Sequence, residues 1–94
     1  MQRRKIEFDE AKNLVNIEKH QISLAQARLI NLNAAHYYQD KRKDYGETRY
    51  IVYGHIMGRL HACIITLRSD TIRVISLRKA NAKEVKHYET ATKK

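Results

Sequence analysis

The chain has 94 residues and a formal net charge of +9, from 19 Lys and Arg against 10 Asp and Glu. A chain of this length predicts a single domain over residues 1–94, and burial of only about 60–65 % of its unfolded surface leaves little room for a deep substrate pocket. The charge favours a polyanionic partner whose binding weakens with salt. Neither a membrane span nor a signal peptide is apparent, so we expect a cytoplasmic protein.

The first half of the chain predicts one short strand and one helix. Residues 5–9, KIEFD, alternate apolar with charged side chains, which is typical of a half-buried strand. Asp9 can cap a helix over residues 10–19. That helix has one mainly apolar face, the kind that an amphipathic helix turns toward a core, made of Ala11, Leu14, Val15 and Glu18.

A second N-terminal helix is predicted over residues 23–30, SLAQARLI. Ser23 and Gln26 have the spacing of a capping box. The inner stripe of this helix is expected to consist of Leu24, Ala27 and Ile30. Residues 34–47, AAHYYQDKRKDYGE, are expected to form a polar, basic loop, whose tyrosines either stack on unpaired bases or pack the loop onto the sheet.

The second half predicts three consecutive antiparallel strands over residues 49–54, 59–68 and 71–79, because β-branched and aromatic residues dominate there. Gly54 and Gly58 are expected to bracket the first reversal.

A final helix is predicted to follow these strands, since Asn81 and Glu84 have the spacing of a capping box. The fold class is therefore α+β, with an antiparallel sheet packed against two N-terminal helices and with a C-terminal helix.

Three arginines occupy predicted strand positions. Strand alternation places Arg49 on the face of Ile51 and Tyr53, whereas it places Arg73 and Arg78 on opposite faces of their strand. Burying an arginine side chain in a sheet costs desolvation free energy unless the guanidinium pairs with a carboxylate or stays in contact with water. Each of these arginines is therefore either a salt-bridged support or part of a site for an anion.

Four segments in this order resemble the BrnT family of bacterial type II toxins: IEFDEAKNLVNIEKHQIS, YGETRYIVYG, GRLHACIIT and IRVISLRKANAKEVKHYE. The resemblance runs from Ile6 to Glu89. It implies a small basic ribonuclease with a RelE-like fold, which a ribbon-helix-helix antitoxin neutralises. The positions that match the family pattern include Phe8, Asp9, Lys12, Asn16, Lys19, His20, Ile22, Ser23, Gly46, Glu47, Arg49, Tyr50, Arg73, Ile75, Ser76, Arg78, Lys79, Ala80, Glu84 and Tyr88.

The sequence also departs from the family pattern around the first helix. Phe8 stands where Trp is common, Glu10 where Pro is common, Gln21 where Gly is common and Leu24 where Phe is common. The turn after this helix is therefore expected to differ in shape.

A ribonuclease that works without a metal needs proton transfer and positive charge around the reacting phosphate. The planar fork of arginine suits the second task, so Arg49, Arg73 and Arg78 are the candidates for it. His20 is the candidate for proton transfer, with helix capping as its alternative role. The candidates for binding RNA are Lys12, Lys19, Lys79, Tyr50 and Tyr88. No cofactor and no metal site are expected, because Cys63 is the single cysteine and the histidines are scattered.

The resemblance implies two partners besides RNA. A ribbon-helix-helix antitoxin is expected to bind two toxins per antitoxin dimer, and operator DNA is reached through the antitoxin. Two alternatives of other classes remain open on the residues alone. The first is a nucleic-acid-binding module without catalysis, and the second is a basic interaction domain for an acidic partner chain.

Overall fold

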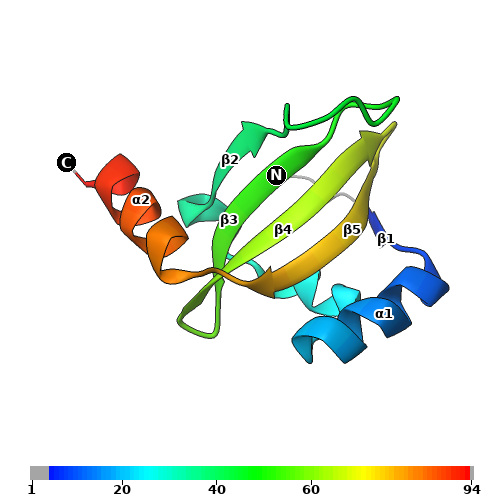
Figure 1. Cartoon of the computed structure of the whole chain (residues 1–94), viewed down its shortest axis with the longest axis horizontal. Coiled ribbons are helices and arrows are strands. Elements are labelled where there is room, and N and C mark those ends of the chain that lie inside the picture. Colours follow the sequence, from blue (N-terminus) through cyan, green and yellow to red (C-terminus); the bar gives the residue numbers. More distant parts are fainter. Residues whose placement is uncertain (1–4, 94) are drawn as a thin grey trace.

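Five strands form one sheet in the order β1-β5-β4-β3-β2 in the computed structural model, which describes residues 5–93 (Figure 1). β1 pairs with β5 in parallel, and the other neighbours are antiparallel. The elements in chain order are β1 (Lys5–Glu7), α1 (Glu10–His20), the 3-10 helices η1 (Leu24–Leu29) and η2 (Leu32–Ala34), β2 (His36–Gln39), β3 (Tyr50–Ile56), β4 (Arg59–Arg68), β5 (Thr71–Lys79) and α2 (Ala82–Thr92).

The expectation of two N-terminal α-helices is wrong, because within residues 5–93 only α1 is an N-terminal α-helix. The other α-helix, α2, is the predicted C-terminal one. The segment after α1 instead forms the 3-10 helix η1. The Ser23 hydroxyl accepts a hydrogen bond from the Ala25 amide, and the Ser23 carbonyl accepts one from Gln26 three residues on, which is the 3-10 pattern. The Asn13 side chain accepts the Leu24 amide hydrogen and so fixes the entry to η1.

The sheet also differs from the prediction at both edges. β1 makes it mixed rather than purely antiparallel, since a parallel strand enters beside β5. β2 lies in the segment that was expected to be a loop, where Tyr37 and Tyr38 supply residues with high strand propensity. The predicted strands over residues 59–68 and 71–79 are confirmed as β4 and β5.

The reversal between β3 and β4 is a two-residue turn at Met57 and Gly58, both with positive φ, as hairpins prefer. Gly54 is not part of this turn but lies inside β3. A Cβ there would overlap the Ile30 side chain, so Gly54 allows the end of η1 to approach the sheet closely.

The main core lies between the sheet and η1 rather than between the sheet and α1. The buried apolar residues of the main core are Leu24, Ala27, Ile30, Ile56, Cys63, Val74 and Leu77. None of them belongs to α1. The expected inner face of α1 points outward instead, with Leu14 68 % and Val15 51 % exposed.

Asn16 explains how α1 is attached. Its side-chain amide donates to the carbonyls of Leu77 and Ile22 at 2.8 and 2.9 Å, and its side-chain oxygen accepts the Leu77 amide hydrogen at 3.2 Å. Asn16 therefore pairs with both backbone groups of one β5 residue, much as another strand would. Because polar groups dominate this contact, the apolar side chains of α1 are not needed there.

α2 packs on the opposite side of the sheet through a second apolar cluster. Leu60, Ala80 and Tyr88 are its buried members, with Tyr53 and Val85 packed against them. The predicted capping box is confirmed, because Asn81 and Glu84 make both of its hydrogen bonds. Figure 1 shows α2 on the β2 side of the sheet and α1 beside the β5 edge. Within residues 5–93, no helix is long and apolar enough to cross a membrane.

Candidate functional site

Arg73 and Arg78 lie on the same face of the sheet, although strand alternation predicts opposite faces. Arg78 pairs with Ala62 of β4, and Arg73 pairs with Thr66. Ala62 and Thr66 are four residues apart on one strand, so they point to the same side, and their partners do as well.

A β-bulge causes this change. Ile64 pairs with Ser76 and Ile65 with Val74, which leaves Ile75 as an extra residue without a direct partner. One extra residue inverts the alternation of everything after it. The sequence contains no proline or glycine that marks the bulge, so the face prediction for Arg78 is wrong for a reason that periodicity alone does not reveal.

Arg49 joins the same face from the start of β3. The next residue, Tyr50, pairs with Ile65, which packs on the main core, so Arg49 points to the other side. We call the surface that contains Arg49, Arg73 and Arg78 the arginine face. It is the side of the sheet on which α2 packs.

Each arginine of this face meets a carboxylate from a different part of the chain. The Arg49 Nε lies 3.4 Å from Glu47, and the Arg73 Nη1 lies 2.8 Å from Glu7. The side chain of Arg49 remains 21 % exposed, that of Arg73 28 % and that of Arg78 35 %. The two roles left open by the sequence are therefore combined, since each guanidinium is supported and still reaches solvent.

Arg78 has the best-defined support. Its Nη1 and Nη2 donate to the two carboxylate oxygens of Glu84 at 2.7 and 2.8 Å, and Nη1 also donates to the Lys79 carbonyl. The Tyr53 hydroxyl and the Asn81 amide donate to the same carboxylate. Glu84 thus joins the end of β5, the middle of β3 and the first turn of α2.

These contacts shift three pKa values. The hydrogen bonds from Arg78 lower the pKa of Glu84 to about 2, and they raise the pKa of Arg78 above its usual range. Burial, followed by the hydrogen bond to Glu84, raises the pKa of Tyr53 to about 12. The site therefore holds a charged arginine, an ionised glutamate and a neutral tyrosine at neutral pH.

One edge of the Arg78 guanidinium stays available for an anion. Within residues 5–93, the side chain bonds Glu84 and Lys79 through Nη1 and Nη2, and Nε takes no partner. The Nε and Nη2 hydrogens of arginine form a second two-pronged edge. Glu84 therefore orients Arg78 by one edge, and the other edge has no partner within residues 5–93.

The loop between β2 and β3 covers the Arg49 end of this face. Asp40 is buried and accepts hydrogen bonds from Arg42 at 2.8 Å and from the Tyr45 hydroxyl at 2.9 Å, and the hydrogen bond from Arg42 holds its pKa well below the usual range. The Arg49 guanidinium lies 4.2 Å from the centre of the Tyr45 ring, a cation–π contact. Tyr45 therefore positions Arg49 as Glu84 positions Arg78.

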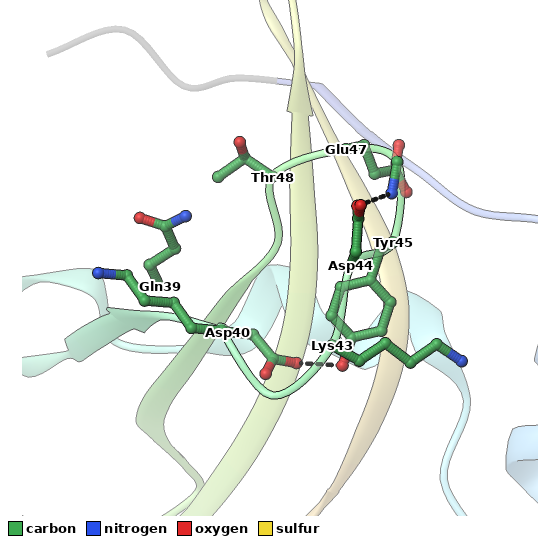
Figure 2. A pocket seen from close by; sticks show the side chains of 9 residues that line it. Gln39, Asp40, Lys43, Asp44, Tyr45, Glu47 and Thr48 are labelled. Carbon is green, nitrogen blue, oxygen red and sulfur yellow. Dashed lines mark hydrogen bonds between the residues drawn. The ribbon is translucent and has the colours of Figure 1, made fainter.

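This loop also encloses an open cavity of about 600 Å³ (Figure 2). Figure 2 shows the hydrogen bonds of Asp40 with Tyr45 and of Asp44 with Gly46, which fold the loop back on itself. Side chains of both charges line the cavity. The acidic ones are Asp40, Asp44 and Glu47, and the basic ones are Lys41 and Lys43.

The helical candidates lie apart from the arginine face. His20 follows Asn16 by one turn of α1, so it belongs to the helix face that meets the sheet edge beside Leu77, the residue before Arg78. No hydrogen bond or ion pair links it to the arginines within the described residues. Lys12 and Lys19 are exposed on α1, and Lys79 is exposed at the end of β5, two residues after Leu77 on the core-facing side.

The two aromatic candidates for RNA binding are engaged inside the protein. Tyr88 is 8 % exposed; its hydroxyl donates to the Ala34 carbonyl, and its ring meets the edges of two histidine rings. Tyr50 faces the core side of the sheet and packs edge to face with Tyr37. Tyr50 lies on the opposite side of the sheet from the arginine face, and Tyr88 is buried under α2 on the same side as Tyr53, which the sequence analysis did not select.

The part of the chain that the structure describes contains no group of three or more His, Cys, Asp or Glu side chains able to hold a metal ion. Cys63 is fully buried, and this burial raises its thiol pKa to about 12. Such a thiol is a packing residue rather than a nucleophile.

The family described as "Ribonuclease toxin, BrnT, of type II toxin-antitoxin system" matches residues 8–84. The chain belongs to the BrnT family. The crystal structure of the Brucella abortus ribonuclease toxin BrnT is similar, with a TM-score of 0.66 and 28 % sequence identity, over 84 % of this chain and 99 % of that chain. No curated protein matches the chain. The resemblance inferred from the sequence is confirmed.

The BrnT match includes every residue of the arginine face and ends at Glu84, the carboxylate that holds Arg78. The three carboxylate partners were not predicted as a set. Glu47 and Glu84 matched the family pattern, and Glu84 also had a capping-box position, but neither signal indicated an arginine partner.

Proposed function

We propose that this member of the BrnT family is an endoribonuclease that cleaves RNA without a metal ion and so inhibits translation in the cytoplasm. The observation that supports this proposal is the gathering of Arg49, Arg73 and Arg78 on one partly exposed face. Three guanidinium groups on one side of a sheet can contact the phosphates of one bound RNA strand, whereas three arginines on separate surfaces cannot.

In the proposed reaction, the ribose 2′-oxygen attacks the adjacent phosphorus while its proton passes to a base. The bond from phosphorus to the 5′-oxygen breaks, and that oxygen takes up a proton. The products are a 2′,3′-cyclic phosphate and a 5′-hydroxyl. Negative charge grows on the phosphate oxygens in the transition state, so arginines that are already oriented lower the barrier most.

Proton transfer is assigned to His20. Imidazole is a common general acid and base, and α1 carries His20 to the sheet edge beside Leu77, the residue before Arg78. The RNA strand is proposed to continue beyond the arginine face to the exposed cations Lys12, Lys19 and Lys79. Tyr50 and Tyr88 require rearrangement before they contact a base, because both rings are packed.

The antitoxin partner is proposed to be a ribbon-helix-helix protein. A dimer of this kind offers two equivalent sites for the toxin, so we expect two toxin chains per antitoxin dimer, with the operator DNA bound by the antitoxin. The net charge of +9 favours a partner that presents carboxylates.

A non-catalytic RNA-binding module is the second candidate. The carboxylate partner of each arginine favours it, since a guanidinium already paired with a carboxylate has less capacity to stabilise the extra charge that develops in a transition state.

The deciding experiment is digestion of RNA by the purified chain in EDTA, with analysis of the product ends. We expect cleavage to products with 2′,3′-cyclic phosphate and 5′-hydroxyl ends, and loss of cleavage in an Arg49→Ala/Arg78→Ala variant that keeps its circular dichroism spectrum. Tight RNA binding by the folded wild type without any cleavage would select the binding module.

A further inference from the structure

Helix α1 is amphipathic, but its apolar side faces away from the protein. The exposed fractions of Leu14, Val15 and Ile17 are 68 %, 51 % and 40 %, while the buried residue of the helix is Asn16. We call Leu14, Val15 and Ile17 the α1 stripe. Single exposed apolar residues are ordinary on a protein surface, but three within one short helix form a patch.

Within residues 5–93, polar side chains rather than this patch hold α1 to the protein. The side of α1 that meets the protein carries Asn13, which fixes Ser23 and Leu24, and Asn16, which bonds Ile22 and Leu77. The apolar stripe therefore does not result from an irregular helix or a slipped register, because polar side chains with specific partners occupy the inner positions. A surface helix without a partner is normally polar on its outer side.

Two cations border the stripe on one side. Lys12 and Lys19 are seven residues apart, which is about two turns of an α-helix, so both project beside Val15. Glu18 follows Leu14 by four residues and Val15 by three, so one carboxylate lies within the stripe. The stripe therefore fits a segment with apolar side chains along its middle, carboxylates toward Lys12 and Lys19, and a cation opposite Glu18. RNA offers negative charge in its phosphates, but its base faces stack on aromatic rings rather than cover aliphatic side chains.

We propose that the α1 stripe is the docking surface for an amphipathic segment of the antitoxin, with its carboxylates toward Lys12 and Lys19. This inference rests on the proposed function for the existence of that partner. A stable interface uses about 20–30 residues on each side, and α1 has 11, so the stripe serves as one anchor within a longer contact. A homodimer through α1 alone falls short of that size.

The apolar residues of the stripe lie apart from the arginine face, although His20, Lys12 and Lys19 of the same helix are assigned to RNA cleavage and binding. α1 lies along the β5 edge, and the stripe projects away from the sheet, whereas the arginine face is the side of the sheet on which α2 packs (Figure 1). A change in the stripe therefore weakens the antitoxin complex and leaves the ribonuclease intact. Such a variant resists neutralisation, which is the functional signature of this surface.

The test uses the double variant Leu14→Gln/Val15→Gln, because glutamine retains helix propensity and both positions are exposed. Leu29→Gln is the matched control, an exposed leucine (53 %) outside α1. The probe is the purified product of the open reading frame adjacent to the gene of this chain, and its affinity is measured by titration calorimetry. Loss of two buried apolar anchors predicts at least 100-fold weaker binding by the double variant.

Three measurements accompany the titration. RNA cleavage by the double variant alone is expected to equal that of the wild type, and the adjacent product is expected to inhibit it poorly. The variant Lys12→Glu/Lys19→Glu is expected to weaken the complex and to reduce its dependence on salt. Light scattering of the free chain is expected to give a monomer.

Each contrary outcome overturns the proposal in a recognisable way. Unchanged affinity of the double variant removes the α1 stripe as the docking surface and leaves the ribonuclease assignment in place. A wild type that cleaves RNA but does not bind the adjacent product removes the partner and with it this role of the stripe. A dimer that the double variant abolishes shows that a second copy of the chain covers the stripe.

Discussion

Helices α1 and α2 have the same length, 11 residues, but they attach to the sheet by opposite means. α1 is held by asparagine side chains and leaves its apolar residues exposed, whereas α2 buries Tyr88 and Val85 and contributes Glu84 to the arginine face. The contrast shows that helix amphipathicity does not by itself reveal which side of a helix meets the protein. It also separates a helix that supports the site from a helix that is free to meet a partner.

The largest expected effect is on activity, through α2. Replacing Glu84 by Ala removes the two-bond support of Arg78, so we expect the rate of RNA cleavage to fall about 10²-fold, the scale of a misplaced catalytic group. Glu89→Ala, an exposed change on the same helix, is the matched control and should leave the rate unchanged. A faster Glu84→Ala variant would mean that Glu84 competes with RNA for Arg78 instead of positioning it.

The next effect is on stability, through α1. Asn16→Ala leaves the amide and carbonyl of Leu77 and the carbonyl of Ile22 without these partners, so we expect a loss of about 3 kcal/mol in the free energy of unfolding. Urea unfolding measures this loss, with the exposed Gln26→Ala as control. A loss below about 1 kcal/mol would show that contacts other than Asn16 hold α1.

A smaller effect depends on pH. The folded-state pKa of Glu84 is lowered to about 2 from an ordinary 4.5, so its ion pair stabilises the fold above about pH 4.5 and loses that effect as the pH falls toward 2. We expect wild type to exceed Glu84→Gln by roughly 2 kcal/mol in the free energy of unfolding at pH 7, with a smaller gap at pH 3. The lowered pKa of Asp40 acts on both proteins and cancels in this difference. A gap that is the same at both pH values contradicts the ion-pair account.

The smallest effect is expected at the α1 stripe. Leu14→Gln should change the free energy of unfolding by less than about 0.5 kcal/mol, because the side chain is 68 % exposed. Urea unfolding again provides the measurement. A loss of about 2 kcal/mol or more would place Leu14 inside the fold and cancel the contrast between the two helices.

Several secondary-structure elements were predictable from local sequence patterns. The bounds of β4 and β5 followed from turn residues and β-branched runs, and the start of α2 followed from the capping box of Asn81 and Glu84. These features depend on neighbours in sequence. The 3-10 form of η1 was not predictable, because it depends on Asn13, whose partner Leu24 lies 11 residues away.

The candidate site was predictable in its residues but not in its arrangement. Arg49, Arg73 and Arg78 were selected from their strand positions and from the resemblance, and the bulge at Ile75 then decides that two of them share a face. Two of the carboxylate partners are near in sequence, Glu47 for Arg49 and Glu84 for Arg78, but Glu7 reaches Arg73 across 66 residues. A contact of that kind depends on strand order, which no local pattern encodes.

The most direct test of the arginine face compares Arg73→Ala with Glu7→Gln in the RNA cleavage assay in EDTA. The two changes break the same ion pair of 2.8 Å, but only the first removes the cation. We predict that Arg73→Ala lowers the cleavage rate by more than about 10²-fold, the scale of one preorganised donor, while Glu7→Gln stays within a few fold of wild type. Equal losses in both variants, or full activity in folded Arg73→Ala, would contradict the account, because Arg73 would then act only as a structural partner of Glu7.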